Sequence, residues 1–220
     1  MTGEALALAA KDLRLELRGR HAVSTVLPFA VTLLVALGLA LGPDRPLLRQ
    51  VAPGLLWITV LFAAVLATRR SYELEGEDGA LEGLLLSPAD PAAIFLGKAA
   101  ALSVQLLALE VVLVTVMALL FGLPLAAAPV ALALVCLLAT VGLAAIGSLF
   151  GVVAQAARTR EGVLPLLVLP AAIPLLVDAV RATSLALEGR DVTGWLGLLL
   201  SFDVVALAAG TLLYGYLVED

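Results

Sequence analysis

Residues 94–121 read IFLGKAAALSVQLLALEVVLVTVMALLF, a long apolar run in which Lys98 and Glu110 are the charged side chains. The hydrocarbon core of a bilayer is about 30 Å thick, and a helix needs roughly 20 consecutive apolar residues to cross it. This run is longer than that. It therefore predicts a helix that spans a membrane.

Comparable apolar runs follow one another along the rest of the chain. Of the 220 residues, 62% are hydrophobic and 14% are charged, whereas soluble domains hold about half and about a quarter. Six spans of this kind leave room only for short loops. We therefore predict an all-α integral membrane protein that forms one transmembrane domain over residues 1–220. The predicted spans are 22–41, 53–68, 94–121, 129–153, 164–180 and 196–218.

The segment before the first span, residues 4–19, is predicted to be an amphipathic helix at the membrane interface. Apolar side chains share one helical face and basic ones share another, although Leu8 and Leu15 fall on the polar side. The run that follows is longer than the apolar core of a signal peptide, which has about 7–15 residues, so we expect it to be retained. The apolar face holds Leu6, Ala10, Leu13 and Leu17, and the basic face holds Lys11, Arg14 and Arg18.

The distribution of basic residues predicts the orientation of the spans. Cytoplasmic loops of membrane proteins carry an excess of Lys and Arg. With six spans, most of the 13 basic residues fall on the side that also holds both termini, so we predict that both termini are cytoplasmic. That side carries Lys11, Arg14, Arg18, Arg20, Arg69, Arg70, Lys98, Arg158 and Arg160; the other carries Arg45, Arg49, Arg181 and Arg190.

The most polar interval of the chain lies on the predicted cytoplasmic side, between the second and third spans. Within it, residues 77–88 predict a short helix that Asp78 caps and Pro88 stops. A short helix with an apolar stripe and acidic neighbours can dock into a groove on another protein. The alternative is a solvated loop that only joins two spans. The candidate docking residues are Glu77, Asp78, Leu81, Glu82, Leu84, Leu85 and Pro88.

Three acidic residues, Glu110, Asp178 and Asp203, fall inside apolar runs. A charge at the bilayer centre costs about 2.5–3.5 kcal/mol on insertion scales, so such side chains usually face the bundle interior or a cavity. Asp178 has Arg181 within helical reach, and we expect Asp203 near the outer interface. Glu110 is the deepest; the open alternatives are a neutral acid, a contact between helices and a contact between subunits.

The fifth predicted span carries three prolines, Pro165, Pro170 and Pro174. Each removes a backbone donor and kinks a helix, which membrane bundles tolerate when neighbours satisfy the freed carbonyls. We therefore expect this helix to be bent or broken. Two interpretations stay open, a flexible gate that lines a path and a static kink that fits the neighbouring helices.

Few residues suggest a cofactor, a metal or a catalytic centre. His21 could ligate haem, but its place at the start of the first span, beside Arg20, favours an interfacial role. The single cysteine, Cys136, can form no internal disulfide or metal cluster. The chain has no Gly-x-x-x-x-Gly-Lys-Ser/Thr phosphate loop and no dense basic face for nucleic acid. We predict that the chain is not an enzyme, and that any ATP is hydrolysed by a partner chain.

Four segments together resemble a known family. They are VAPGLLW at 51–57, DGALEGLLLSP at 78–88, FLGK at 95–98 and GVLPLLVLPAAIPLL at 162–176, and they occur in the order found in haem exporter protein B. The resemblance implies a permease of the ABC-2 type in c-type cytochrome maturation at the bacterial inner membrane. It covers the chain from end to end.

The resemblance also implies partners and local structures. Two copies of the permease would pair with two copies of a cytoplasmic ATPase, together with a tryptophan-rich, haem-handling membrane subunit and a small single-span subunit. Residues 77–88 would be the coupling helix that seats in the ATPase, and residues 181–200 would form re-entrant helices on the periplasmic side. Haem is the implied cargo, which this subunit either conducts or helps its partner to release.

Three rival interpretations remain open at this level. The first is an ABC-2 exporter subunit for another cargo, such as a lipid-linked glycan or a drug. The second is a proton-coupled secondary transporter that uses Glu110, Asp178 and Asp203. The third is an assembly scaffold that transports nothing.

Overall fold

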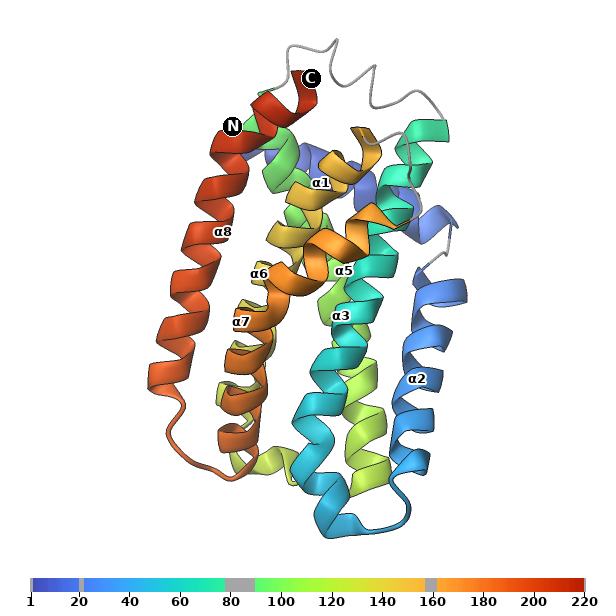
Figure 1. Cartoon of the computed structure of the whole chain (residues 1–220), viewed down its shortest axis with the longest axis vertical. Helices are drawn as coiled ribbons and strands as arrows, with labels where there is room; N and C mark the ends of the chain where they lie inside the picture. Colours follow the sequence, from blue (N-terminus) through green and yellow to red (C-terminus); the bar gives the residue numbers. More distant parts are fainter. Residues whose placement is uncertain (1, 20–21, 78–89, 157–161, 220) are drawn as a thin grey trace.

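The computed structural model describes residues 2–19, 22–77, 90–156 and 162–219, and those residues form helices with no strand among them. Figure 1 shows a bundle of long helices, with both chain termini at the same end. We call this end the termini end. The helices are α1 (Thr2–Gly19), a π-helical segment (Ala22–Val26), α2 (Leu27–Ala40), α3 (Arg45–Glu77), α5 (Pro91–Phe121), α6 (Pro129–Ala156), α7 (Val163–Leu187) and α8 (Thr193–Glu219), with a short 3-10 turn at Leu125–Ala127.

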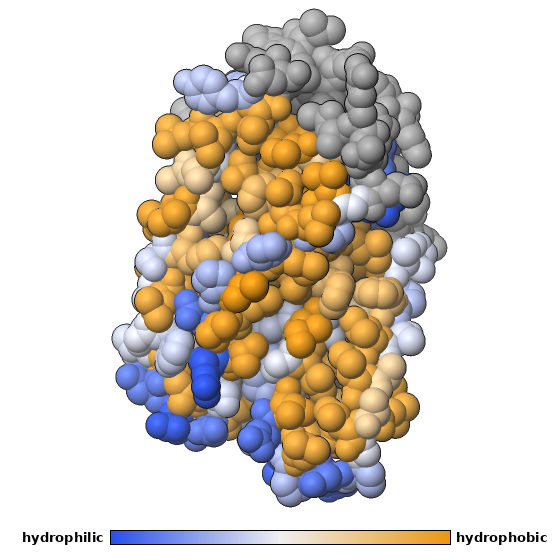
Figure 2. All heavy atoms as spheres, viewed as in Figure 1, coloured by the Kyte–Doolittle hydropathy of each residue, from blue (hydrophilic) through white to orange (hydrophobic). Residues whose placement is uncertain are grey.

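Five of these helices, α3 and α5 to α8, are long and apolar enough to cross a membrane. The first predicted span corresponds to the π-helical segment and α2, which follow each other directly over residues 22–40. α2 alone has 14 residues, about 21 Å of helix, and this region gives a sixth candidate span only when it is joined with α1 in one bent pair. Figure 2 shows apolar side chains over the middle of the bundle, with hydrophilic ones gathered at the end opposite the termini. The prediction of an all-α, multi-pass membrane protein is confirmed.

The connection between α7 and α8 differs from the expected re-entrant helices over residues 181–200. α7 continues to Leu187, and a turn through Gly189, at φ 67°, leads to α8 at Thr193. Asp191 caps the new helix by accepting from the backbone N–H and the hydroxyl of Thr193, at 3.1 and 2.6 Å. These hydrogen bonds hold the pKa of the Asp191 carboxyl below its usual range. A tight turn therefore replaces the re-entrant segment.

Helix α5 has well-defined ends. The side chain of Asp90 accepts from the backbone N–H of Ala92 at 3.0 Å, and Pro91 occupies the first turn, where its missing N–H costs nothing. At the other end, Gly122 adopts φ 66° and closes the helix in the left-handed conformation. Because α5 begins at Pro91, Lys98 lies in its second turn, near the termini end, and Glu110 lies farther along the same helix.

Helix α6 is the centre of the bundle, packing against α3, α5, α7 and α8. A polar link inside the core joins α3 to α7, because the indole N–H of Trp57 donates to the Thr183 hydroxyl at 2.8 Å and both residues are fully buried. The largest buried side chains include Trp57, Leu34, Leu56, Leu106, Leu113, Leu143, Leu175 and Leu199.

Helix α1 crosses the bundle near the termini end and packs on α5 (Figure 1). The two backbones approach closely at Gly97, where an added Cβ would lie 2.8 Å from Leu8 Cβ and 3.0 Å from the Ala5 carbonyl oxygen. Leu6 and Leu17, on the predicted apolar face, are 70% and 76% exposed. Leu6 and Leu17 of this face are therefore exposed, Ala10 and Leu13 are half-buried, and Leu8 packs toward α5.

Candidate functional site: polar contacts inside the bundle

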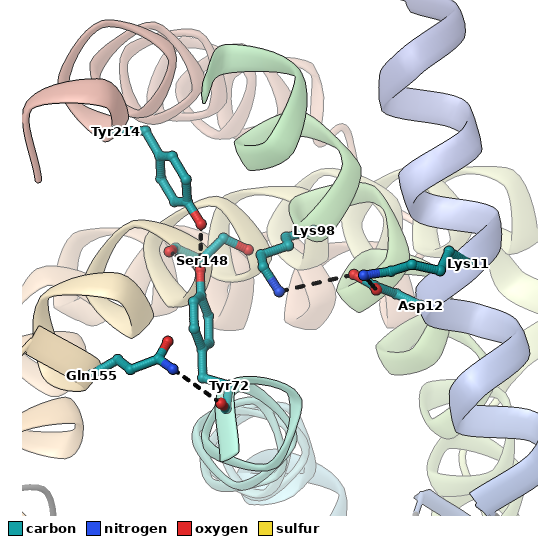
Figure 3. A network of polar contacts seen from close by, with 7 residues as sticks. All are labelled: Lys11, Asp12, Tyr72, Lys98, Ser148, Gln155 and Tyr214. Carbon is teal, nitrogen blue, oxygen red and sulfur yellow. Dashed lines mark hydrogen bonds and ion pairs between the residues drawn. The ribbon is translucent and has the colours of Figure 1, made fainter. Parts of the chain in front are cut away.

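A polar network at the termini end is built around Lys98 of α5. The side chain is 4% exposed, and its Nζ lies 4.0 Å from Asp12 Oδ2 on α1 and 4.5 Å from the centre of the Tyr72 ring on α3. An ammonium group within about 6 Å of an aromatic face is attracted to the ring. Lys98 therefore joins α1 and α3 to α5, as Figure 3 shows.

Tyr72 extends this network to two more helices. Its hydroxyl donates to the Ser148 carbonyl on α6 at 2.7 Å and lies 3.3 Å from the Tyr214 hydroxyl on α8 (Figure 3). The side-chain amide of Gln155 donates to the Tyr72 carbonyl at 3.4 Å. Five helices are thus connected at the place where α3 leads into residues 78–89. We call the contacts among Asp12, Tyr72, Lys98, Ser148 and Tyr214 the termini-end network.

Replacing Lys98 with methionine is expected to loosen α1 from the bundle. The change removes the ammonium that contacts both Asp12 and the Tyr72 ring, and losing one member of a buried charge pair costs a few kcal/mol. Because Asp12 keeps a contact with Lys11 at 3.1 Å, we expect the free energy that holds α1 on the bundle to fall by only about 2 kcal/mol. Trypsin cleavage at Arg14 and Arg18 in the purified protein should become faster.

Lys11→Met is the matched control, because it removes the other lysine that contacts Asp12. Lys11 is 38% exposed, and exposed ion pairs contribute about 0–1 kcal/mol. Its cleavage rate at Arg14 and Arg18 should match that of the unmodified protein. Equal rates for Lys98→Met and Lys11→Met would show that the network does not hold α1.

A second polar contact lies deeper in the bundle, between α5 and α6. Glu110 is 2% exposed, and its Oε1 accepts from the Thr140 hydroxyl at 2.5 Å. Glu110 Oε2 has no hydrogen-bond partner among the described residues. Of the alternatives for Glu110, the contact between helices of one chain is thus present in the structure.

Asp203 lies on α8 and faces α6 and α7. It is 3% exposed, and neither carboxyl oxygen has a hydrogen-bond partner within the described part of the chain. A Cβ added at Gly142 of α6 would lie 2.7 Å from Asp203 Oδ1 and 3.0 Å from Leu175 of α7. Asp203 lies about 15 Å along α8 from its first residue, Thr193. Packing against Gly142 therefore buries Asp203 inside the bundle, and its position near the outer interface stays a prediction.

Asp178 and Arg181 lie on α7 and do not form the expected pair. Asp178 is half-buried and Arg181 is exposed. Among the described residues, no ion pair or hydrogen bond joins the two side chains. Asp178, Glu110 and Asp203 therefore belong to different environments, and only Glu110 has a polar side-chain partner in the described structure.

The proline-rich helix is bent but unbroken. α7 runs from Val163 to Leu187, with Pro165 in its first turn and Pro170 and Pro174 inside it. In Figure 1 its first turns run obliquely and its later turns run along the bundle. Pro170 and Pro174 are on the exposed side of the helix. This placement supports the static-kink interpretation for these two prolines, while a role in gating stays a prediction.

Several predicted residues lie outside the described part of the chain. They are His21 and the docking residues from Asp78 to Pro88, while Glu77 is the last residue of α3. Conversely, the termini-end network was not predicted from the sequence, where Lys98 appeared as a charged residue of the span 94–121 and among the basic residues of the cytoplasmic side. The available signal was a lysine inside an apolar run. Within the described residues, no group of three or more metal-ligating side chains is found.

Comparison with known proteins places this arrangement in a family. The sequence profile described as "CcmB protein" matches residues 4–218. The chain is similar to "Heme exporter protein B" of Pseudomonas aeruginosa, at 32% identity over 91% of this chain and 89% of the relative. It is also similar to the protein of that name from Rhodobacter capsulatus, at 30% identity over 92% of each chain. The relative from Bradyrhizobium diazoefficiens is 32% identical over 83% of this chain and 82% of its own length. The chain therefore belongs to the CcmB protein family.

Proposed function

We propose that this chain is the membrane permease subunit of an ABC transporter that serves c-type cytochrome maturation. The subunit either exports haem or uses ATP hydrolysis in a partner to release haem from a membrane subunit that holds it. The observation that carries the proposal is similarity along nearly the whole chain to proteins named heme exporter protein B. The multi-pass helical bundle supports a role inside the membrane.

The proposed assembly contains two copies of this chain and two copies of a cytoplasmic ATPase, with a tryptophan-rich haem-handling subunit and a small single-span subunit. Its location is the bacterial inner membrane, with both termini in the cytoplasm. The placement of basic residues supports this orientation, because Arg69 and Arg70 lie in the part of α3 that leads toward the termini end. Each copy forms one permease domain over residues 1–220.

Residues 77–88 are the proposed contact with the ATPase. The support is twofold: this segment carries the apolar stripe and acidic residues of a docking helix, and α3 leads into it without a break after Tyr72. A displacement of the segment would act on α3, and the termini-end network would pass it to four other helices. The network is thus the proposed connection between ATP hydrolysis and the bundle.

Deletion and complementation test the cargo. A strain lacking this chain should lose haem-loaded c-type cytochromes, measured by haem staining and by absorption spectra of its membranes, and the intact gene should restore them. Normal cytochromes in the deletion strain would point to an exporter of another cargo. Restoration that persists without any ATPase partner, and that depends on the proton gradient, would instead indicate a secondary transporter.

Replacing Glu110 with alanine is expected to reduce cytochrome c maturation more than replacing it with glutamine. A glutamine oxygen can still accept from the Thr140 hydroxyl, whereas alanine leaves a cavity and removes the acceptor. Each lost contact of this kind costs about 1–3 kcal/mol. The measurement is the yield of haem-loaded cytochrome at equal amounts of the variant in the membrane. Equal and severe losses in both variants would show that an ionised group is needed.

A further inference from the structure

An apolar groove of about 400 Å³ lies beneath α1, where α1, α2 and α3 meet α5. Its volume is in the range of small-molecule sites in proteins. Glu16 and Gln105 are the polar residues among those that line it. The apolar lining includes Leu13, Leu17, Leu27, Val104, Ala108 and Val112.

The groove opens sideways, toward the space that lipid occupies. Leu17, Val104 and Val112 line it and are 76%, 51% and 37% exposed. Val104 and Val112 belong to α5, one of the helices long and apolar enough to cross the membrane. A hydrocarbon chain of the bilayer can therefore enter the groove without passing through the bundle.

A second pocket, also about 400 Å³, adjoins this groove and is lined by charged side chains as well as apolar ones. Val26 lines both. The second pocket is also lined by Thr25, Arg69, Arg70 and Glu73. Glu73 accepts from Arg69 Nε at 2.6 Å and lies 3.6 Å from Arg70 Nη1, so the described lining carries two positive charges and one negative. The apolar groove and a pocket whose described lining carries a net positive charge thus share Val26 as part of their walls.

We propose that these adjoining pockets bind one anionic phospholipid of the surrounding bilayer. An acyl chain fills the groove between α1 and α5, and the phosphate lies against Arg69 and Arg70 with the Thr25 hydroxyl as a further donor. Guanidinium groups bind phosphate through charge-assisted hydrogen bonds, and basic pockets at the cytoplasmic ends of spans suit anionic headgroups. The bound lipid would connect the interfacial helix to α2, α3 and α5.

The side chains of the two pockets favour a lipid over haem. Protein ligands of haem iron are histidine, cysteine, methionine or tyrosine side chains, and the described residues that line the pockets include none of them. The proposal concerns membrane lipid and depends on the position of the helices in the bilayer. It goes beyond the proposed transport of haem and does not rest on it.

Photolabelling with lipid probes tests the site. The complex is purified from its native membrane and placed in phosphatidylcholine nanodiscs that contain a trace of phosphatidylglycerol with a diazirine on its acyl chain. We expect adducts on the α1 peptide around Leu13 and Leu17 and on the α5 peptide around Val104 and Ala108. The same probe built on phosphatidylcholine should label these peptides roughly fivefold less.

Variants separate the two parts of the site. Ala108→Trp fills the groove and should remove most of the labelling, whereas Val111→Trp, at a position of α5 that is 69% exposed and outside the groove, should leave it unchanged. Arg69→Gln with Arg70→Gln should bring the anionic probe down to the level of phosphatidylcholine. If that double variant does not assemble, competition of unlabelled phosphatidylglycerol against phosphatidylcholine on the unmodified complex decides the same point.

Four results would overturn the proposal. The first is equal labelling by the two probes, and the second is equal labelling of Ala108→Trp and Val111→Trp. The third is labelling of the isolated chain but not of the complex, which would mean that a protein partner covers the groove. The fourth is displacement of the probe by stoichiometric haem without any preference for anionic lipid.

Discussion

Replacing Leu81 with aspartate is expected to abolish co-purification of the ATPase with this chain while leaving membrane insertion intact. Leu81, Leu84 and Leu85 fall on one side of the helix predicted over residues 77–88. A carboxylate placed in an apolar groove of a partner loses its hydration, which costs several kcal/mol unless it is paired. Because each 1.4 kcal/mol changes an affinity tenfold, the affinity of this chain for the ATPase should fall at least about a hundredfold.

Leu86→Asp is the control for that substitution. It introduces the same charge into the same segment, but Leu86 lies off the stripe formed by Leu81, Leu84 and Leu85. The control should retain the ATPase, as measured by the ratio of the two proteins after affinity purification in mild detergent. Retention of the ATPase by Leu81→Asp would exclude this stripe as the docking surface, and loss in both variants would show that any added charge disrupts the segment.

Replacing Gly210 with alanine is expected to destabilise the bundle, although alanine normally favours a helix over glycine by about 1 kcal/mol. An added Cβ at Gly210 of α8 would overlap the ring of Phe95, which is completely buried on α5. Overpacking of this kind costs about 1–3 kcal/mol and sometimes more. The melting temperature of the purified protein should fall by roughly 5–10 °C.

Gly197→Ala, in the same helix, should not lower the melting temperature. No atom outside the local helix backbone lies within 4 Å of a Cβ added at Gly197, so only the helix propensity of alanine should act. We expect an unchanged or slightly higher melting temperature. If both substitutions raised the melting temperature, the close packing of α8 on α5 at Phe95 would be wrong.

Hydropathy predicted the membrane fold because each spanning helix must satisfy its own backbone within a long apolar run. It could not predict helix ends outside that run. α3 continues past the predicted end at residue 68 to Glu77, and the contact between Arg69 and Glu73, one helical turn apart, stabilises the extension. α7 likewise continues past its predicted end at residue 180 to Leu187, where Ala182, Leu185 and Ala186 favour a helix.

A lysine inside an apolar run indicated a polar contact, but the partners of Lys98 in the termini-end network could not be predicted, because they depend on how distant helices pack. From the sequence, Lys98 is a basic residue near the start of a span, and Leu8 is an exception to the amphipathic pattern of residues 4–19. Both assignments change once α1 lies on α5 at Gly97, since Leu8 then contacts α5 and Asp12 approaches Lys98. Glu110 differs, because the cost of an acid in a membrane already indicated a partner, although nothing in the spacing identified Thr140.

Affinity purification of this chain from its native membrane would show directly whether it is the permease of an ABC transporter. The co-purifying proteins would be identified by mass spectrometry, and an absorption spectrum of the eluate would be recorded. We expect to recover an ATPase subunit together with a tryptophan-rich membrane subunit that carries haem, seen as a Soret band. Purification of the intact chain without any ATPase would contradict the proposal that it is the permease of an ABC transporter.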